Sequence, residues 1–425
     1  MKRLLKSVHW LLGYRGIPFM SRPTFRYEII STVFLGAATA LLMPSFTQLF
    51  ARKTLDANRW IVAALLLQIA VGNLFGAFLG PYLQRRRRIR YGVAARLLIA
   101  VSMLGVALLP PGSRSACPYL GMIILSGLLA AVALNVLSSI WHSNYPAEIR
   151  GQIFSRRYVV NIIFMACSMK LAGYVLDAWP WGHCLVYSVG AACMIAAAIT
   201  FSRIRVRGER GMLRREAQDS FNVLAGFALL WRDRQYGRFM AWQMVSGSAT
   251  LLTYSIVLLV LTDHLEVSYT QGTTAIAIVG LGVAVLAAPI CGRLFDTLGV
   301  SKFRAIGAAM LASSRLVLFA AAIAKSWPLA LVAFVFQGLG LATGGLAFSI
   351  GHTRFAHPRE GQLYMGIHMT LQGLRGMTMP FLGMWLYETV GLGLSLLIVA
   401  AAVQFIAVAG FALSPALADA GATGD

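Results

Sequence analysis

The sequence predicts an all-α integral membrane protein in which twelve transmembrane helices form two six-helix bundles. Three observations support this fold class: the composition, a series of long apolar runs, and an internal repeat. The chain has 425 residues, of which 58% are hydrophobic and 12% are charged. Soluble domains have about 25% charged residues, so this composition excludes an ordinary soluble protein.

Apolar runs of about 20 residues, the length that crosses the hydrocarbon core of a bilayer, occur twelve times along the chain. The first six lie at residues 27–51, 59–83, 93–110, 117–141, 157–178 and 183–202. The second six lie at residues 238–262, 272–292, 304–324, 327–350, 363–387 and 391–413. We therefore expect an N-terminal bundle over residues 27–202 and a C-terminal bundle over residues 238–413.

Three segments lie outside the two predicted bundles. Residues 1–26 place Leu4, Val8 and Leu12 on one helical face, which predicts an amphipathic cytoplasmic segment that lies on the membrane surface. Residues 203–237 are rich in arginine and are expected to be a basic cytoplasmic linker. Residues 414–425 are expected to be a cytoplasmic tail.

Basic residues are distributed unevenly between the two sides of the predicted membrane. The connections on one side, with Arg304 counted among them, hold 29 of the 37 Lys and Arg residues, and those on the other side hold five. Because cytoplasmic loops have an excess of Lys and Arg, we expect both termini in the cytoplasm, with the protein in a bacterial inner membrane. This topology explains the formal net charge of +22, so no nucleic-acid partner is expected.

The two predicted bundles share short sequence matches at a constant spacing. Three pairs of identical residues are each 212 positions apart and follow the second and fourth helix of each bundle. These pairs are Gly80 and Gly292, Pro146 and Pro358, and Glu148 and Glu360. The repeat predicts two bundles in parallel orientation, related by an axis along the membrane normal.

The loops at these positions resemble the signatures of the major facilitator superfamily. The segment G-P-Y-L-Q-R-R-R-R from Gly80 to Arg88 is similar to that family's motif G-x-x-x-D-R-x-G-R-[RK], with Gln84 in place of the acid. The second copy, from Gly292 to Val300, keeps the acid as Asp296 but has neither arginine. The run P-A-E-I-R-G that begins at Pro146 resembles the family's loop between its fourth and fifth helices.

The resemblance implies an alternating-access transporter whose cytoplasmic side is locked by a charge network in the outward-facing state. The expected gating residues are Arg85, Arg88, Glu148, Arg150, Asp296 and Glu360. A carboxylate at a helix N-terminus is stabilised by the helix dipole and can pair with a guanidinium across the bundle interface. The alternative is that the arginines only bind anionic lipid and that Asp296 is a structural residue.

Ionisable side chains in the middle of a membrane cost about 2.5 to 3.5 kcal/mol each on insertion scales, so they usually face a cavity. Lys170, Arg315 and Arg375 have such positions, whereas acids such as Glu28 and Asp177 lie near predicted helix ends. We therefore expect an electropositive cavity. In the family that the sequence resembles, the ninth helix is peripheral, which implies that Arg315 snorkels or pairs structurally.

The predicted eleventh helix places His368, Gln372 and Arg375 on one face. We expect them to bind an anionic or zwitterionic solute, with Lys170 as the second cation unless Lys170 pairs with Asp177. The other expected substrate-binding residues are Gln243, Tyr254, Gln337 and Asn161. The alternative is that these polar side chains only bond neighbouring helices.

Methionine pairs at i and i+4 suggest a soft-metal alternative, a copper transporter, because thioethers suit Cu(I). The pairs are Met165 and Met169, Met240 and Met244, and Met365 and Met369. The alternative is that these residues fill helix interfaces. The five cysteines have no C-x-x-C spacing, so we expect neither a disulfide framework nor a zinc site, and no cofactor.

These observations favour a secondary active or facilitative transporter over an enzyme, since the chain has no phosphate-binding loop and no spacing typical of a catalytic triad. The expected partners are a small-molecule substrate and the lipid bilayer, and the expected oligomeric state is a monomer. The alternative function is a receptor or assembly protein with a transporter fold and no flux, because fold alone does not determine function.

Overall fold

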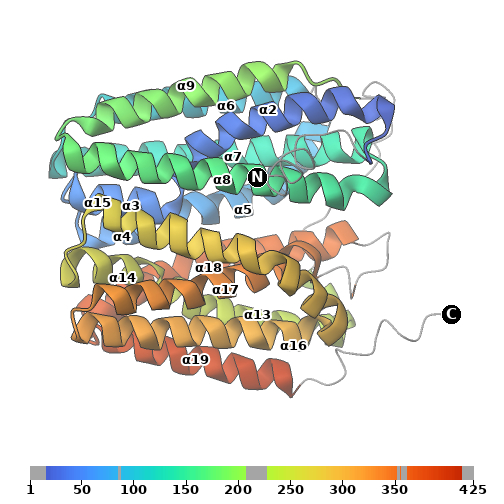
Figure 1. Ribbon diagram of the computed structural model, residues 1–425. Coiled ribbons are helices and arrows are strands. Elements are labelled where there is room, and N and C mark those ends of the chain that lie inside the picture. The colour runs from blue at the N-terminus through green and yellow to red at the C-terminus, as the bar shows by residue number, and fades with distance from the viewer. Residues whose placement is uncertain (1–15, 85–87, 207–226, 352–354, 356–360, 414–425) are drawn as a thin grey trace, which may run out of the picture.

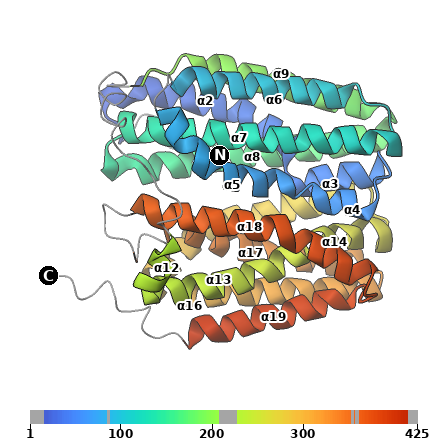
Figure 2. The ribbon, with the colours of Figure 1, turned by 180° about the vertical axis from the view of Figure 1, so that it is seen from behind.

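The computed structural model describes residues 16–84, 88–206, 227–351, 355 and 361–413. The described chain is almost entirely helical, and its helices run side by side in two stacked groups (Figures 1 and 2). Helices α2 to α9 form one group, and helices α12 to α19 form the other. The predicted all-α fold with twelve crossings is confirmed.

The first crossing is divided by a bend. Helix α2 (Arg22–Thr39) and the short helix η2 (Ala40–Leu42) are followed by α3 (Pro44–Lys53). The bend is at Met43, whose backbone is extended with φ −65° and ψ 133°. Proline has no N–H and disfavours helical dihedrals in the residue before it, so Pro44 starts a new helix. The second crossing consists of α4 (Arg59–Ala64) and α5 (Leu67–Gln84).

The remaining crossings of the N-terminal half are single long helices. They are α6 (Arg88–Ala107), α7 (Ala116–Asn144), α8 (Ala147–Ala178) and α9 (Gly182–Ser202). Helix α8 begins ten residues before the predicted span at residue 157. The difference arises because an apolar run marks only the part of a helix within the hydrocarbon, whereas α8 continues through polar residues beyond it.

The seventh crossing consists of α13 (Arg234–Leu252), α14 (Tyr254–Leu259) and the π-helical segment η5 (Val260–His264), and it follows the short helix α12 (Leu229–Arg232). The eighth consists of α15 (Tyr269–Thr273), the π-helical segment η6 (Thr274–Leu281) and the first part of α16 (Gly282–Ile323). The second part of α16 is the ninth crossing. Gly299 separates the two parts with φ +72°, a conformation that only glycine adopts without strain.

The last three crossings are α17 (Trp327–Ile350), α18 (Gly361–Glu388) and α19 (Ser395–Ala412). Among the described residues, ten helical segments are long and apolar enough to cross a membrane. Helix α18 is not one of these ten, because it contains Arg375 and several polar side chains. Large apolar side chains such as Leu108 and Leu286 are exposed, at 84% and 78%, as expected for contact with lipid. The chain is an integral multi-pass membrane protein.

The two halves contact each other mainly where α18 packs against α5 and α4, and where α8 packs against α15 and η6; α3 also contacts α14, α15 and η5. Glycines permit the approach of α18 to α5. A Cβ atom added to Gly376 would lie 2.9 Å from the Cβ of Ala70, and one added to Gly373 would lie 3.1 Å from the backbone N of Leu74. Small residues of this kind let helix backbones pack closely in a membrane.

One end of the molecule is filled by a hydrophobic core that both halves share. The largest buried cluster includes Phe46 and Leu49 of the first half with Leu258 and Leu261 of the second. We call this end, where α3, α4, α14 and α15 lie, the α3/α14 end. Helix α2 begins and α19 ends at the opposite end, which we call the terminal end (Figure 1).

Candidate functional site

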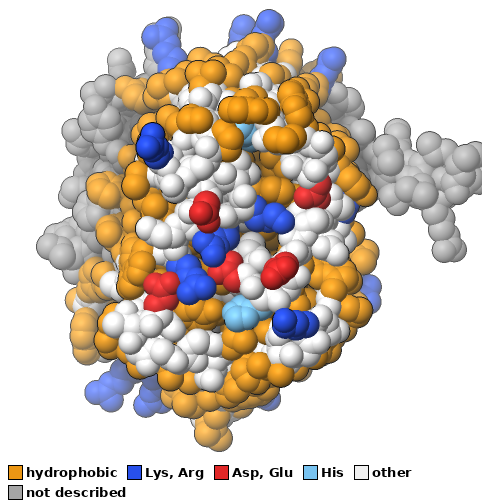
Figure 3. Space-filling model, turned by 90° about the vertical axis from the view of Figure 1, so that its left-hand side faces the viewer, with side chains coloured by type: hydrophobic (Ala, Val, Ile, Leu, Met, Phe, Trp, Pro, Cys, Tyr) orange, Lys and Arg blue, Asp and Glu red, His pale blue; other side chains and the backbone are white. Residues whose placement is uncertain are grey.

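Charged side chains connect the two halves at the surface of the α3/α14 end. The Asp263 carboxylate accepts two hydrogen bonds from Arg52, at 2.9 Å from Nε and 3.1 Å from Nη2. Arg59 lies between two acids, 3.3 Å from Asp263 Oδ2 and 3.3 Å from Glu388 Oε1. We call these four residues the latch. Figure 3 shows acidic and basic side chains gathered at the centre of this end.

Uncharged groups continue the connection beneath the latch. Tyr254, an expected substrate-binding residue, has its hydroxyl 3.0 Å from the Ser45 hydroxyl of the other half. Gln48 donates to the Ser255 hydroxyl at 2.8 Å. Five of the hydrogen-bonded pairs that join the halves at this end are 207 to 215 residues apart in sequence, close to the 212-residue repeat. The first crossing of each half therefore meets its equivalent at the α3/α14 end.

Lys170 and Asp177 lie on α8 and contact the opposite half. The Lys170 ammonium donates to the Thr270 carbonyl at 2.9 Å and also to the Thr274 hydroxyl. The Asp177 carboxylate accepts from the backbone N–H groups of Tyr269 at 2.8 Å and Thr270 at 2.6 Å. A carboxylate at this position caps the start of α15. Lys170 thus lies on the contact between α8 and α15, away from the residues that surround Arg375.

Arg375 of α18 is buried, with 8% of its surface exposed. Its Nη1 donates to the backbone carbonyl of Gln243 at 2.8 Å, and its Nε has no hydrogen-bond partner. The guanidinium lies directly against Gly247 of α13. A Cβ atom added to that glycine would be 1.8 Å from Nη1, so glycine is required for Arg375 to adopt this position.

Arg304 is a second buried cation at the same place. From the sequence it is expected in a cytoplasmic loop. It lies at the start of the second part of α16, is 4% exposed, and donates from Nε to Gln243 Oε1 at 2.9 Å. Its guanidinium also lies 5.8 Å from the Phe411 ring centre. Gln243 therefore accepts hydrogen bonds from two guanidinium groups, one at its side-chain oxygen and one at its backbone oxygen.

Of the two expectations for Arg315, snorkelling or structural pairing, the structure agrees with structural pairing. Arg315 is 2% exposed and donates to the Thr253 hydroxyl at 2.9 Å and to Gln337 Oε1 at 2.7 Å. The second part of α16 packs against α17 and α19, so this side chain points into the C-terminal half. Gln337, an expected substrate-binding residue, accepts a hydrogen bond from Arg315 here.

The other expected substrate-binding residues lie at different places. His368 is 2% exposed and its ring packs edge-on against Phe348, with centres 4.8 Å apart. The side-chain carbonyl of Gln372 is buried and accepts no hydrogen bond. Asn161 belongs to the N-terminal half, where its backbone carbonyl would be 2.7 Å from a Cβ added to Gly36. The structure therefore brings Gln243 to Arg375 but keeps Asn161 apart from them.

The expected cytoplasmic gate is only partly within the described chain. Arg85 and Glu360 lie outside the described residues. The backbones of Arg88, Glu148 and Asp296 are helical, but their side chains also lie outside the description. Arg150 donates from Nε to the Tyr145 carbonyl at 3.0 Å. The gate remains a prediction.

The N-terminal half contains a buried acid, Glu28, which is 2% exposed. Its carboxylate accepts from Trp141 Nε1 at 2.6 Å and from the Tyr145 hydroxyl at 2.7 Å, and it lies 3.4 Å from Arg157 Nε. Burial, reinforced by the charge of Glu28, raises the pKa of the Tyr145 hydroxyl far above its usual range. The phenol therefore remains a proton donor to this carboxylate.

The methionine pairs are on three different helices. Met165 and Met169 are on α8, Met240 and Met244 on α13, and Met365 and Met369 on α18. Met169 and Met240 are buried in two separate hydrophobic clusters, whereas Cys167 is exposed. No group of three or more His, Cys, Asp or Glu side chains suited to a metal is found among the described residues. The burial of Met169 and Met240 among apolar side chains favours the packing interpretation for these two residues.

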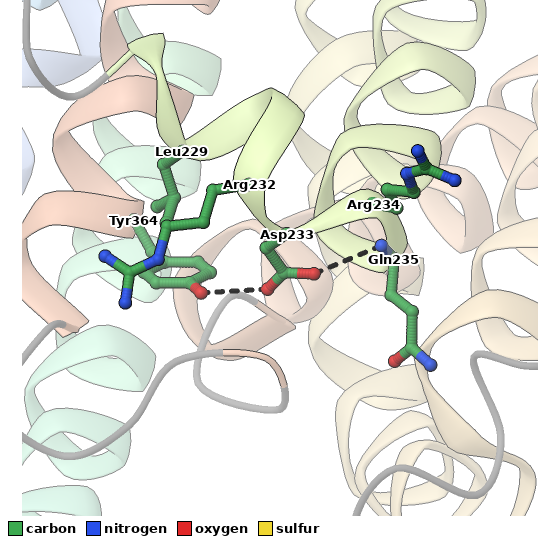
Figure 4. Close-up of a pocket in the computed structure, with 6 residues that line it drawn as sticks. All are labelled: Leu229, Arg232, Asp233, Arg234, Gln235 and Tyr364. Carbon is green, nitrogen blue, oxygen red and sulfur yellow. Dashed lines mark hydrogen bonds between the residues drawn. The ribbon is translucent and has the colours of Figure 1, made fainter.

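A pocket of about 450 Å³ lies at the terminal end. Figure 4 shows its lining residues, which are Leu229, Arg232, Asp233, Arg234, Gln235 and Tyr364. Asp233 caps α13 by accepting from the backbone N–H groups of Gln235 and Tyr236, and it also accepts from the Tyr364 hydroxyl at 2.8 Å. This carboxylate already has three donors, and none of the expected site residues lines the pocket.

The described interior of the C-terminal half is therefore strongly positive. Arg304, Arg315 and Arg375 are buried there, and their hydrogen bonds are to neutral oxygen atoms. The described acids of this half lie elsewhere: Asp263 and Glu388 in the latch, Asp233 at the start of α13, and Glu266 at an exposed position. The electropositive cavity expected from the sequence stays a prediction.

Comparison with known proteins agrees with this architecture. Residues 239–421 match the family model of the Major Facilitator Superfamily. No curated protein sequence matches the chain. The structure of the nucleoside transporter NupG has a similar fold, with a TM-score of 0.70, 11% identity and coverage of 93% of this chain and 99% of that one.

Two further solved structures have similar folds. The inward-open xylose transporter XylE from E. coli gives a TM-score of 0.69 at 15% identity, covering 93% of this chain and 96% of that one. The peptide transporter POT bound to alafosfalin gives 0.67 at 13% identity, covering 93% and 95%. The C-terminal half of the chain therefore matches the major facilitator superfamily by sequence, and both halves share the fold of these solved transporter structures.

Proposed function

We propose that the protein is a secondary transporter, and not an enzyme, that moves a small negatively charged solute by alternating access between its two halves. The observation that supports a negative charge on the solute is the set of three buried guanidinium groups in the C-terminal half. Their described partners are all neutral oxygens. A bound anion would supply the missing counter-charge.

A buried guanidinium group without a compensating negative charge is energetically costly. A buried ion is tolerated when it is paired, and removal of its partner costs several kcal/mol. Arg375 makes one hydrogen bond to a carbonyl and leaves its Nε without an acceptor. Its planar group can donate two parallel hydrogen bonds to a carboxylate or phosphate. Arg375 is therefore the proposed centre of substrate binding, with Gln372 and His368 on the same helix.

The proposed topology follows from the distribution of basic residues. With both termini in the cytoplasm of a bacterial inner membrane, the α3/α14 end faces outward and the latch closes the outer side. Opening to the outside then requires separation of Arg52 and Arg59 from Asp263. A transporter of this kind exists in two states, and a solute shifts the population only if it binds them with different affinity. We propose that a monomer is sufficient for this cycle.

Solute flux in proteoliposomes tests the proposal. Purified protein should transport at least one compound from a panel of small organic and inorganic anions, and Arg375→Gln should reduce that flux by tenfold or more. Arg114, which is exposed in the short helix η3 (Ser113–Ser115) before α7, provides a control of the same charge, and Arg114→Gln should transport normally. Normal flux of the anion by Arg375→Gln would contradict the proposal.

A further inference from the structure

Gln243 holds Arg304 and Arg375 next to each other inside the C-terminal half. The donor atoms of the two guanidiniums lie 2.9 Å from its side-chain oxygen and 2.8 Å from its backbone oxygen. Both arginines are more than nine-tenths buried. Two like charges this close repel each other strongly in a low-dielectric interior, so the pair is stable only with a compensating negative charge.

Each of the two guanidinium groups has more N–H donors than the hydrogen bonds described above use. An arginine side chain carries five N–H groups, whereas the hydrogen bonds given above use one from Arg304 and one from Arg375. The Nε of Arg375 is buried without an acceptor. The absence of a Cβ at Gly247 leaves room for the Arg375 guanidinium against α13. The site is therefore rich in donors and short of acceptors.

The equivalent place in the N-terminal half has an acid. Arg96 lies on α6, which corresponds to the second part of α16 in the repeat, and its guanidinium is 3.7 Å from the Phe201 ring centre. Arg304 lies 5.8 Å from the Phe411 ring centre. The N-terminal half, however, also contains the buried Glu28 carboxylate, which lies 3.4 Å from Arg157 Nε. The C-terminal half has an arginine and an aromatic ring 208 and 210 residues further along the chain, but 212 residues after Glu28 it has Met240.

From this difference we infer that Arg304 and Arg375 together bind one dianionic oxyanion group, a phosphate, phosphonate or sulfate, on the transported solute. The inference rests on the proposed function and names its substrate class. Arg304 then replaces Lys170 as the second cation of the site. Two charges on the ligand neutralise both guanidiniums, whereas a monocarboxylate leaves one of them uncompensated. A tetrahedral group also has enough oxygen atoms to accept hydrogen bonds from two planar guanidinium groups.

The first test measures ligand-dependent thermal stability of the purified full-length protein at constant ionic strength. Sulfate, inorganic phosphate, an alkyl phosphate monoester and acetate are each titrated, because a ligand that binds the native state raises its apparent stability. Sulfate and phosphate also stabilise proteins non-specifically, so only a saturable shift counts as binding. We expect saturable shifts with the dianions and at least tenfold weaker binding of acetate. Inorganic phosphate and the monoester distinguish a free ion from an esterified group as the preferred ligand.

Lysine variants test the two arginines individually. Arg304→Lys and Arg375→Lys keep the positive charge but remove the planar guanidinium group and its paired N–H donors. Each variant should therefore weaken dianion binding by at least tenfold. Arg96→Lys is the matched control, because it changes the equivalent arginine of the other half and should leave ligand binding unchanged. Equal loss in Arg96→Lys would show that the effect is structural and would overturn the assignment.

A pH series needs no variant and remains informative if a variant fails to fold. The second pKa of a phosphate monoester is about 6, so lowering the pH from 7.5 to 5 converts the dianion to a monoanion, while sulfate stays divalent. Monoester affinity should fall about tenfold over this range and sulfate affinity should stay constant. Saturable binding of monoanions and dianions with equal affinity would overturn the dianion site but leave an anion transporter intact. Binding of no anion at all would overturn the proposed function as well.

Discussion

At the scale of single residues, the unusual feature of this molecule is where its charges are buried. In the N-terminal half, Glu28 lies within 3.4 Å of Arg157. In the C-terminal half, Arg304 and Arg375 are bonded to one glutamine and to neutral oxygen atoms. Because an unpaired buried charge is costly, the first arrangement stabilises the fold and the second is suited to binding an anion.

Gly247→Ala tests the space around Arg375. The added methyl group would lie 1.8 Å from Arg375 Nη1, so the guanidinium must move away from the Gln243 carbonyl. We expect at least a tenfold loss of anion affinity, measured by thermal-shift titration. In the matched control Gly345→Ala, the methyl group meets nothing within 4 Å; stability should change by about 1 kcal/mol or less and anion binding should be unchanged. Wild-type affinity in Gly247→Ala would show that the position of Arg375 is irrelevant to binding.

Glu28→Gln tests the opposite case, a charge pair that is structural. Removal of one member of a buried pair leaves Arg157 uncompensated, so the free energy of unfolding should fall by about 3 kcal/mol. Denaturant unfolding in detergent measures this change. Glu266→Gln, at an exposed position, should leave stability unchanged. A wild-type unfolding free energy for Glu28→Gln would mean that the hydrogen bonds from Trp141 and Tyr145 are sufficient without the negative charge.

At the scale of elements, the structure shows a closed α3/α14 end. The side chains of most of the expected gating residues at the terminal end lie outside the described residues. Irregular helices concentrate in the seventh and eighth crossings, where η5 and η6 are π-helical and α13 ends at Leu252. Helix irregularities of this kind are frequent at functional sites and hinges. The latch residue Asp263 lies in η5, so separation of the halves and rearrangement of this crossing are expected to occur together.

Asp263→Asn should weaken the latch and open the outer side more often. The amide cannot neutralise Arg52 and Arg59, so the like charges of the two arginines favour separation. The accessibility of a cysteine at position 254 to a membrane-impermeant reagent added outside should increase severalfold. Asp56→Asn is the control, because Asp56 is exposed and its carboxylate lies 3.7 Å from Arg52 of its own half. Unchanged labelling in Asp263→Asn would show that the latch does not hold the outer side closed.

Asp296→Asn should act in the opposite direction if the acid helps to close the cytoplasmic side, as the resemblance of its loop implies. The inward-facing population should increase, and a cavity cysteine should become more accessible from the cytoplasmic side. Combining Asp296→Asn with Asp263→Asn should partly restore the wild-type distribution. If neither single variant changes accessibility, the two acids are packing or capping residues.

At the scale of the whole molecule, the sequence predicts the helices well and the contacts between them poorly. The span 327–350 coincides with α17, and 183–202 differs from α9 by one residue, because apolar length is a local property. The latch was not predicted, since Arg52 and Asp263 are 211 residues apart. Arg304 was counted with the cytoplasmic loops because basic residues beside an apolar run usually lie there, and only the packing of α16 shows that it is buried.

If an anion bound in the C-terminal half controls alternating access, it must change the distance between the two halves at the α3/α14 end. Spin labels at Asp56 and Glu266 are placed at exposed positions of opposite halves at this end, and their separation is measured with and without a transported anion. We expect the anion to change the populations of short and long separations in the wild-type protein and to have no effect in Arg375→Gln. An identical distance distribution in the wild-type protein with and without every transported anion would contradict this expectation.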